Sequence, residues 1–340
     1  MTEETLRRLR VGIVGAGVMG TVYAGAIARG DTRWRASVAG ICDRDVLAAN
    51  RLAADCGAPA YTDLAEMLER ERPDLVYVAV PDHLHKEPFL TCMEHRVPCL
   101  VEKPLATTLP DAVEMRDAAR AAGVVTEVNF ANRFNPAFVR MREAIVAGDV
   151  GEVVGVNARL SNVLDYPLRA LSWAGRTTCG WFLLSHVFDL AHWLTGASAV
   201  DVTAHGVKGR LVADGVDTYD VIQSLVRYDA GFGGIYESAW VLPDSLPAGV
   251  DFKVELLGTE GALYVDTQDQ MVHLATSRRF TYPGTLDWTQ TRLSAFLDRV
   301  AENDVPAGVL DDGVENTALL VALHDAITAG ATVRLAEQVR

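Results

Sequence analysis

Apolar and polar positions alternate along the first third of the chain with two different periods. Short, almost continuous apolar runs are typical of strands buried on both faces of a sheet, and the longer stretches between them have helical spacing. The predicted strands are 8–14, 36–42, 74–80, 99–102 and 124–128, and the predicted helices are 21–29, 46–56, 61–71, 84–95 and 110–122. This alternation indicates an α/β fold with a doubly wound parallel sheet of about six strands.

The pattern changes after Pro136. One helix at 137–147 leads into a series of strands, several of them separated by glycine-containing turns, which is typical of a mostly antiparallel sheet. The predicted strands are 153–160, 199–208, 220–228, 233–241, 252–257, 262–266 and 271–275, and helices at 289–302 and 313–329 follow. The sequence therefore predicts two domains, a nucleotide-binding domain at 1–128 and an α+β domain at 129–340.

A glycine motif connects the first predicted strand to the first predicted helix. In this context Gly15 is expected to make the tight turn, Gly17 to let the backbone approach a pyrophosphate, and Gly20 to let the helix pack closely. Backbone N–H groups at the helix start then face the phosphates. The cofactor-binding residues predicted in this loop are Gly15, Ala16, Gly17, Val18 and Met19.

An acidic residue, Asp43, ends the second predicted strand, where it is placed to accept a hydrogen bond from a ribose 2′-hydroxyl. A carboxylate here repels the 2′-phosphate of NADP, so NAD is the expected cofactor. Arg44 leaves NADP open, because a guanidinium can pair with a phosphate or stack on adenine. Alternatively, Asp43 and Asp45 simply cap the helix at 46–56.

Two later predicted strands, 74–80 and 99–102, are followed at their carboxyl ends by Pro81-Asp82-His83 and by Lys103-Pro104. Ligands of open α/β sheets bind outside the carboxyl ends of the strands. Lys103 follows the strand at 99–102, and burial in a cleft would lower its pKa so that the amine can act as a base. Alternatively, Lys103 only pairs with Glu102 at the sheet edge. The further predicted cofactor contacts are Val80, Pro81, His83, His85, Glu102 and Lys103.

Composition narrows the class of protein. The chain has 340 residues, of which 49% are hydrophobic and 22% charged, and its net charge of −14 opposes nucleic-acid binding. We find neither an apolar run of membrane-spanning length nor a secretory signal, so we expect a cytoplasmic protein without a membrane partner. The five cysteines show no paired spacing and are expected to be reduced. His83 and His85 lack further ligands at useful spacing, so no metal site is expected.

Six motifs, in this order and spacing, resemble the Gfo/Idh/MocA oxidoreductases over nearly the whole chain. The motifs are 15–20 (GAGVMG), 78–85 (VAVPDHLH), 102–104 (EKP), 132–136 (NRFNP), 186–189 (HVFD) and 193–196 (WLTG). The resemblance implies a Rossmann domain and an open-faced C-terminal sheet that is often used for oligomerisation, here as a homodimer or homotetramer. It also implies NAD(P)-linked oxidation or reduction of a sugar, polyol or related hydroxyl compound. Lys103 and His186 would line the reaction centre.

The resemblance assigns His186, on the helix-like segment 181–194, a role as substrate-hydroxyl ligand or proton relay. Asp189, three residues on, is expected to orient it or to serve as a buried cap or ion-pair partner. Sugar and inositol dehydrogenases of this type commonly carry an aspartate four residues before the histidine, but this chain has Phe182 there. Either another polar residue replaces the acid, or the substrate is less polar at that point, or activity is lost. The candidate replacements are Asp165, Tyr166 and Asn129.

Polar residues just after the first domain are further candidates for substrate contacts. Asn129 and Arg133 lie where the chain is expected to cross an interdomain cleft, although Arg133 serves equally well as an interdomain salt-bridge residue. The segment 161–180 has few apolar repeats and is predicted to be a specificity loop. Together with Phe182, which with Trp181 forms either an aromatic wall or core packing, the predicted substrate contacts are Asn129, Arg133, Asp165, Tyr166, Trp173, Phe182 and His186.

Two alternative functions stay open at this point. The missing acid is compatible with a nucleotide-binding sensor or regulator, although Lys103 and His186 argue against it. Another branch of the superfamily uses tightly held NAD for redox-assisted glycoside cleavage. Our main hypothesis is an NAD(P)-dependent dehydrogenase or reductase of a sugar, inositol or related polyol.

Overall fold

The computed structural model describes residues 8–29, 35–246, 249–266, 271–276, 280–281 and 288–335. The described chain divides into two compact units. Unit 1 comprises residues 8–29, 35–106, 110–131 and 288–314. Unit 2 comprises residues 107–109, 132–246, 249–266, 271–276, 280–281 and 315–335. The domain boundary between residues 128 and 129 stays a prediction.

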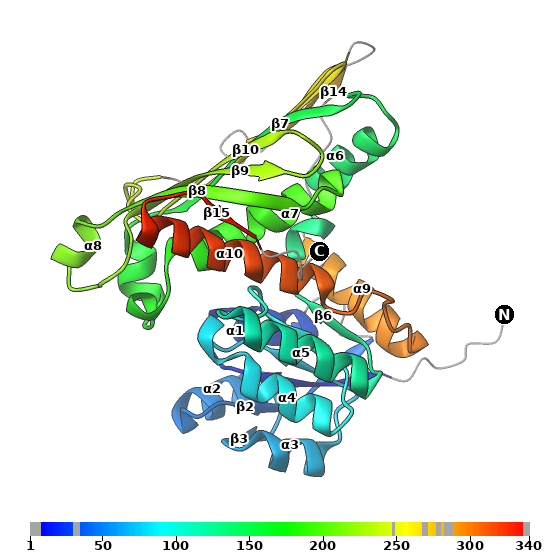
Figure 1. Cartoon of the computed structure of the whole chain (residues 1–340). Coiled ribbons are helices and arrows are strands. Elements are labelled where there is room, and N and C mark those ends of the chain that lie inside the picture. The colour runs from blue at the N-terminus through cyan, green and yellow to red at the C-terminus, as the bar shows by residue number, and fades with distance from the viewer. Residues whose placement is uncertain are drawn as a thin grey trace. The chain divides into compact units, whose positions relative to one another are not determined.

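Unit 1 is built on a six-stranded parallel sheet with the strand order β3-β2-β1-β4-β5-β6 (Figure 1). Its strands are β1 (Leu9–Val14), β2 (Ala36–Cys42), β3 (Ala60–Tyr61), β4 (Leu75–Val78), β5 (Cys99–Val101) and β6 (Thr126–Val128). Its helices are α1 (Val18–Arg29), α2 (Val46–Cys56), α3 (Leu64–Glu71), α4 (Lys86–Glu94), α5 (Leu109–Ala122) and α9 (Trp288–Glu302), with a 3₁₀ turn, η2, at Asp82–Leu84. The predicted doubly wound fold is confirmed.

The candidate cofactor-binding segments of unit 1 all follow the carboxyl ends of strands of its sheet. The order of the strands reverses at β1 and β4, and ligands of such sheets bind at this switch point, outside the carboxyl ends of the strands. The glycine loop follows β1, residues 79–85 follow β4, and Glu102 and Lys103 follow β5. Because all six strands are parallel, these three segments share the same edge.

Two predicted helices of unit 1 differ from the structure. The helix predicted at 61–71 begins at Leu64, because the side chain of Asp63 accepts a hydrogen bond from the backbone of Glu66 at 2.8 Å and caps it. Tyr61 instead belongs to β3, which pairs with β2. The helix predicted at 84–95 is present as α4 but is shorter at both ends, and Leu84 belongs to the preceding 3₁₀ turn η2. Caps and two-residue strands leave too short a signal for periodicity to detect.

Unit 2 is built on a nine-stranded mixed sheet with the order β14-β13-β12-β11-β7-β10-β9-β8-β15. Only the pairing of β10 with β7 is parallel among these strands. The strands are β7 (Val153–Asn162), β8 (Ala199–Val207), β9 (Val221–Tyr228), β10 (Gly233–Ala239), β11 (Val250–Gly258), β12 (Gly261–Asp266), β13 (Met271–Thr276), β14 (Phe280–Thr281) and β15 (Val333–Arg334). The predicted α+β fold with a mostly antiparallel sheet is confirmed.

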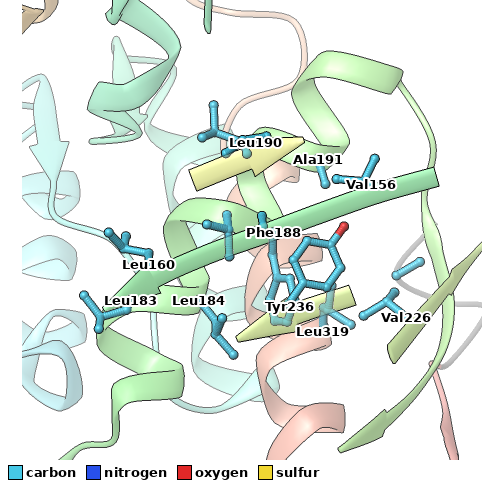
Figure 2. Packing of buried hydrophobic residues seen from close by; sticks show 14 of the residues in the cluster. Val156, Leu160, Leu183, Leu184, Phe188, Leu190, Ala191, Val226, Tyr236 and Leu319 are labelled. Carbon is cyan, nitrogen blue, oxygen red and sulfur yellow. The ribbon is translucent and has the colours of Figure 1, made fainter. Parts of the chain in front are cut away.

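One face of this sheet carries the core of unit 2. Its helices are α6 (Pro136–Val146), α7 (Ser185–Thr195), α8 (Arg210–Ala213) and α10 (Asp311–Ala329), of which α10 begins in unit 1. Figure 2 shows Phe188 of α7 against Tyr236 of β10, and their ring centroids are 4.9 Å apart. From Ile222 to the end of β9, buried and exposed residues alternate, as expected for a strand with only one covered face.

The segment 161–180, predicted as a loop, is partly ordered into regular structure. Strand β7 extends to Asn162, with Ser161 fully buried. A π-helical turn, η4, forms at Tyr166–Ala170, and a 3₁₀ turn, η5, follows at Ala174–Arg176. A second π-helical turn, η6, at Gly180–Leu184 then runs into α7. The loop prediction was wrong here because turns of this kind have no apolar period to detect.

Candidate active site

The glycine loop between β1 and α1 has three glycines that differ in the space around them, Gly15, Gly17 and Gly20. Gly15 has φ +99°, and a Cβ atom there would lie 2.4 Å from the carbonyl oxygen of Ala79. A Cβ atom on Gly20 would lie 1.8 Å from the carbonyl oxygen of Gly15. Gly17 differs, since a Cβ atom there would meet nothing within 4 Å. The loop is therefore packed tightly at Gly15 and Gly20 and open at Gly17, which leaves room there for a phosphate.

The start of α1 is suited to an anion. Its first turn contains no acidic residue, and its positive dipole end and outward N–H groups attract phosphate. Val18 and Met19, at the first two helical positions, are 48% and 38% exposed. The open face at Gly17 and this helix start fit the pyrophosphate of a dinucleotide.

Asp43 joins the loops after β1 and β2. Its Oδ2 accepts a hydrogen bond from the backbone N–H of Ala16 at 2.7 Å, and its Oδ1 accepts one from the N–H of Asp45 at 2.9 Å. The helix α2 is capped by Asp45, which accepts from Leu47 and Ala48. Asp43 thus holds a carboxylate against the glycine loop, where a ribose hydroxyl can donate to it. The adjacent Arg44 is exposed.

His85 ties the segment after β4 to the segment after β5. Its buried ring places Nδ1 2.7 Å from the carbonyl oxygen of Pro104 and Nε2 3.0 Å from that of Val80. Burial lowers the pKa of His85, while the charge of Asp82 and the carbonyl of Pro104 oppose the shift. A neutral ring can donate to only one of the two carbonyls. His83 lies beside Asp82, with its Nδ1 3.2 Å from the carboxylate.

Glu102 lies in a buried hydrogen-bond network. Its Oε1 accepts from the hydroxyl of Tyr77 and from the amide of Asn129, the latter at 2.6 Å, and its Oε2 accepts from the backbone of Lys103 at 3.2 Å. Asn129 in turn accepts from the hydroxyl of Tyr23 at 3.0 Å. Burial and the charge of Glu102 hold the pKa of Tyr77 well above its usual range. The carboxylate of Glu102 is thereby fixed inside unit 1.

Lys103 follows this carboxylate directly, and its peptide bond to Pro104 is cis. The side chain is partly buried. Burial lowers the pKa of the Lys103 ammonium, and the negative charges of Glu102 and Asp82 oppose part of this shift. The amine form is therefore reached at a lower pH than for an exposed lysine, which is what a general base near neutrality requires.

In unit 2, His186 is the second residue of α7, directly after the π-helical turn η6. Its Nδ1 lies 3.2 Å from the amide nitrogen of Asn132. Asn132 belongs to a 3₁₀ turn, η3, at Ala131–Phe134. The next residue of that turn, Arg133, forms a two-pronged ion pair with Asp189 of α7, with Nε to Oδ2 at 3.0 Å and Nη2 bonded to Oδ1. The turn η3 is therefore joined to α7 by two consecutive side chains.

Phe182 lies in an aromatic cluster of unit 2. Its ring centroid is 5.6 Å from that of Tyr166, 6.0 Å from that of Trp173 and 5.8 Å from that of Trp240. Pairs at these separations contribute about 0.5–1.5 kcal/mol each beyond their buried area. Phe182 therefore has a packing role in unit 2.

The residues predicted to contact substrate lie in different parts of the structure. Asp165 forms an exposed ion pair with Arg169 at 2.8 Å. The side chains of Asn129 and Arg133, predicted to contact substrate, are engaged in the Glu102 network and in the Asp189 pair, and their substrate roles stay predictions. Sequence reasoning missed Tyr23, Tyr77 and the contact of Asn132, because their partners are distant in sequence.

Two features are absent from the described residues. No group of three or more His, Cys, Asp or Glu side chains is arranged to hold a metal ion there. In the same residues no helix has the length and apolar character needed to cross a membrane.

The Rossmann sheet, the glycine loop and the lysine after β5 define the class of the protein, an NAD-binding oxidoreductase. The model of an oxidoreductase family with an NAD-binding Rossmann fold matches residues 9–130, and the model of the Gfo/Idh/MocA C-terminal domain matches residues 138–264. The chain therefore belongs to the Gfo/Idh/MocA family, as the sequence motifs predicted. Two of the relatives below are named as inositol dehydrogenases, and the protein is an enzyme acting on a CH–OH group.

Three relatives cover most of the chain. The scyllo-inositol 2-dehydrogenase (NAD(+)) of Bacillus subtilis is 24% identical, covering 84% of this chain and 85% of its own. Inositol 2-dehydrogenase 2 of Saccharopolyspora erythraea is 26% identical, covering 95% and 94%. The crystal structure of GenD2 from gentamicin A biosynthesis, in complex with NAD, is 25% identical with a TM-score of 0.82 and covers 98% of each chain.

Proposed function

We propose that the protein is an NAD-dependent dehydrogenase that interconverts a secondary alcohol and a ketone of a cyclic polyol or sugar, with Lys103 as the group that exchanges the hydroxyl proton. The observation that carries the proposal is the position of Lys103, at the carboxyl end of β5 and beside a buried carboxylate, with its pKa lowered by burial. The names of the inositol dehydrogenases among the relatives support the substrate class.

The chemistry divides between the cofactor and the chain. When bound, NAD supplies the acceptor for the hydride that leaves the carbinol carbon. The neutral amine of Lys103 takes the hydroxyl proton as the C–O bond becomes a carbonyl, and the resulting ammonium releases the proton to solvent. In the reductive direction the Lys103 ammonium donates the proton to the carbonyl oxygen. The resemblance assigns His186 to the same reaction, and this assignment stays a prediction.

The preference for NAD over NADP is supported by Asp43. Its carboxylate accepts from the backbone of Ala16 and Asp45 and so is fixed beside the glycine loop. A 2′-phosphate brought to this position would face a fixed negative charge. We therefore expect NAD to be favoured, with NADP used only weakly through Arg44.

We also propose that the protein is a homodimer or homotetramer formed through the outward face of the sheet in unit 2. Leu225 of β9 and Ile235 of β10 are directly opposite each other and are 54% and 59% exposed. Exposed aliphatic pairs on a sheet face are typical of contact surfaces. Light scattering after chromatography would test this, since Leu225→Asp should yield monomers.

The cytoplasmic location stays a prediction that cell fractionation can check.

The central test is a screen of inositols, aldoses and keto-sugars with NAD and NADP, followed through absorbance of the reduced nicotinamide. We expect steady formation of free NADH from at least one cyclic polyol or sugar, and loss of turnover by about 10²–10⁴-fold in Lys103→Met. Arg227→Met, which alters an exposed ion pair with Asp201, is the matched control for loss of a cation. Net glycoside cleavage with NAD retained, or NAD binding without turnover on every compound, would contradict the proposal in favour of the glycosidase or the sensor.

A further inference from the structure

The hydrogen bond between Asn132 and His186 defines the protonation of the imidazole. The amide nitrogen of Asn132 lies 3.2 Å from Nδ1 of His186, and Asn132 is only 8% exposed. An amide nitrogen carries two hydrogens and accepts no hydrogen bond, so Asn132 donates and Nδ1 accepts. A neutral imidazole has one N–H, which must then be on Nε2.

The acidic residue near the pair of Asn132 and His186 is Asp189, and its carboxylate is bonded to Arg133. Asp189, three residues after His186 on α7, has both carboxylate oxygens bonded to Arg133. The position one turn before His186 is Phe182, whose ring packs against Tyr166 and its neighbours. The group that contacts Nδ1 of His186 is thus the amide donor of Asn132. A carboxylate in the same place would accept a hydrogen bond and would require a hydrogen on Nδ1.

We propose that Asn132 is a positioning residue that selects the His186 imidazole tautomer with its hydrogen on Nε2, so that Nε2–H is the hydrogen-bond donor that the ring offers to a substrate oxygen. The substrate half of this statement rests on the proposed function.

Nitrogen NMR of histidine tests the tautomer without relying on activity. The full-length protein is labelled with ¹⁵N-histidine and measured without substrate, both with and without saturating NAD. Eight histidines are present, so the signals of His186 are assigned by their loss in His186→Gln. We expect an unprotonated Nδ1 and a protonated Nε2 in the wild-type protein. In Asn132→Asp the carboxylate accepts, so the Nδ1 signal should move to the protonated region.

A neighbouring asparagine supplies the structural control. Asn135 is equally buried, but its Oδ1 caps α6 by accepting from the backbone of Ala137 at 3.0 Å. Asn135→Ala should lower the melting temperature and leave both nitrogen signals of His186 in place. Asn132→Ala should remove the tautomer preference and produce a mixture.

A protonated Nδ1 in the wild-type protein would overturn the proposal. So would an unchanged Nδ1 signal in both Asn132→Asp and Asn132→Ala, or the same change in Asn135→Ala. These outcomes do not depend on turnover, so a failed substrate screen would count against the proposed function and not against the tautomer. With an active substrate, we expect Asn132→Asp to lower kcat about tenfold or more, and Asn132→Gln, which keeps the donor, to recover part of that loss.

Discussion

Replacing Asp189 with asparagine should destabilise unit 2 by about 3 kcal/mol, the lower end of the range for breaking a buried ion pair. The Asp189 side chain is 2% exposed, and both of its oxygens accept from Arg133, with Nε to Oδ2 at 3.0 Å. The Arg133 side chain keeps 19% exposure, so water can still solvate part of the guanidinium. For this reason we choose the lower end of the range.

The assay is urea unfolding followed by the fluorescence of the tryptophans in unit 2. The free energy of unfolding in water is compared between the wild-type protein, Asp189→Asn, Arg133→Met and the double variant Arg133→Met with Asp189→Leu. The double variant should be less destabilised than either single variant, because no charge is then left without its partner. Arg227→Met, in the exposed pair with Asp201, should change the unfolding free energy little.

A buried structural ion pair is contradicted if Arg133→Met keeps the wild-type free energy of unfolding but raises KM tenfold or more. That result would make Arg133 a substrate contact, the alternative that the sequence left open. A purely structural pair predicts the reverse, a loss of stability with KM nearly unchanged once the protein is folded.

Three further predictions concern unit 1. Lys103→Met should stabilise the protein at neutral pH, because the lowered pKa of Lys103 in the folded state makes its ammonium form destabilising there. This gain in unfolding free energy should shrink as the pH rises toward the ordinary lysine pKa, and urea unfolding between pH 7 and 10 measures it. Glu102→Gln should lower the pKa of Lys103 further and move the acid limb of kcat/KM to lower pH, and an unmoved limb would exclude this charge as a cause. Asp43→Ala should weaken NAD binding and reduce the discrimination against NADP, as measured by calorimetric titration with both nucleotides.

The fold was predictable because it depends on long apolar runs. Strands β1 and β2 each bury most of their residues, and such runs are visible in a single sequence. Strands β3 and β15 have two residues each and exist only because a longer neighbour pairs with them. Propensity and period give no signal for strands of this length.

Candidate residues were predictable where one local motif carries the chemistry. The glycine loop and the lysine after β5 are each defined within a few positions of sequence. The network around Glu102 is not, because Tyr77 and Asn129 lie 25 and 27 positions from it in the sequence and Tyr23 lies 106 from Asn129. Asn129 was accordingly predicted as a substrate contact, whereas its amide is bonded inside unit 1.

The phenylalanine at position 182 changes the chemistry that unit 2 can supply. A carboxylate there would lie among the rings of Tyr166, Trp173 and Trp240, where desolvation disfavours the ionised form. The neighbouring acid, Asp189, is neutralised by its ion pair with Arg133. Neither position therefore provides a carboxylate to accept a proton from His186. The proposed role of Lys103 as the group that exchanges the hydroxyl proton, which the lowering of its pKa by burial supports, does not require an acid at position 182.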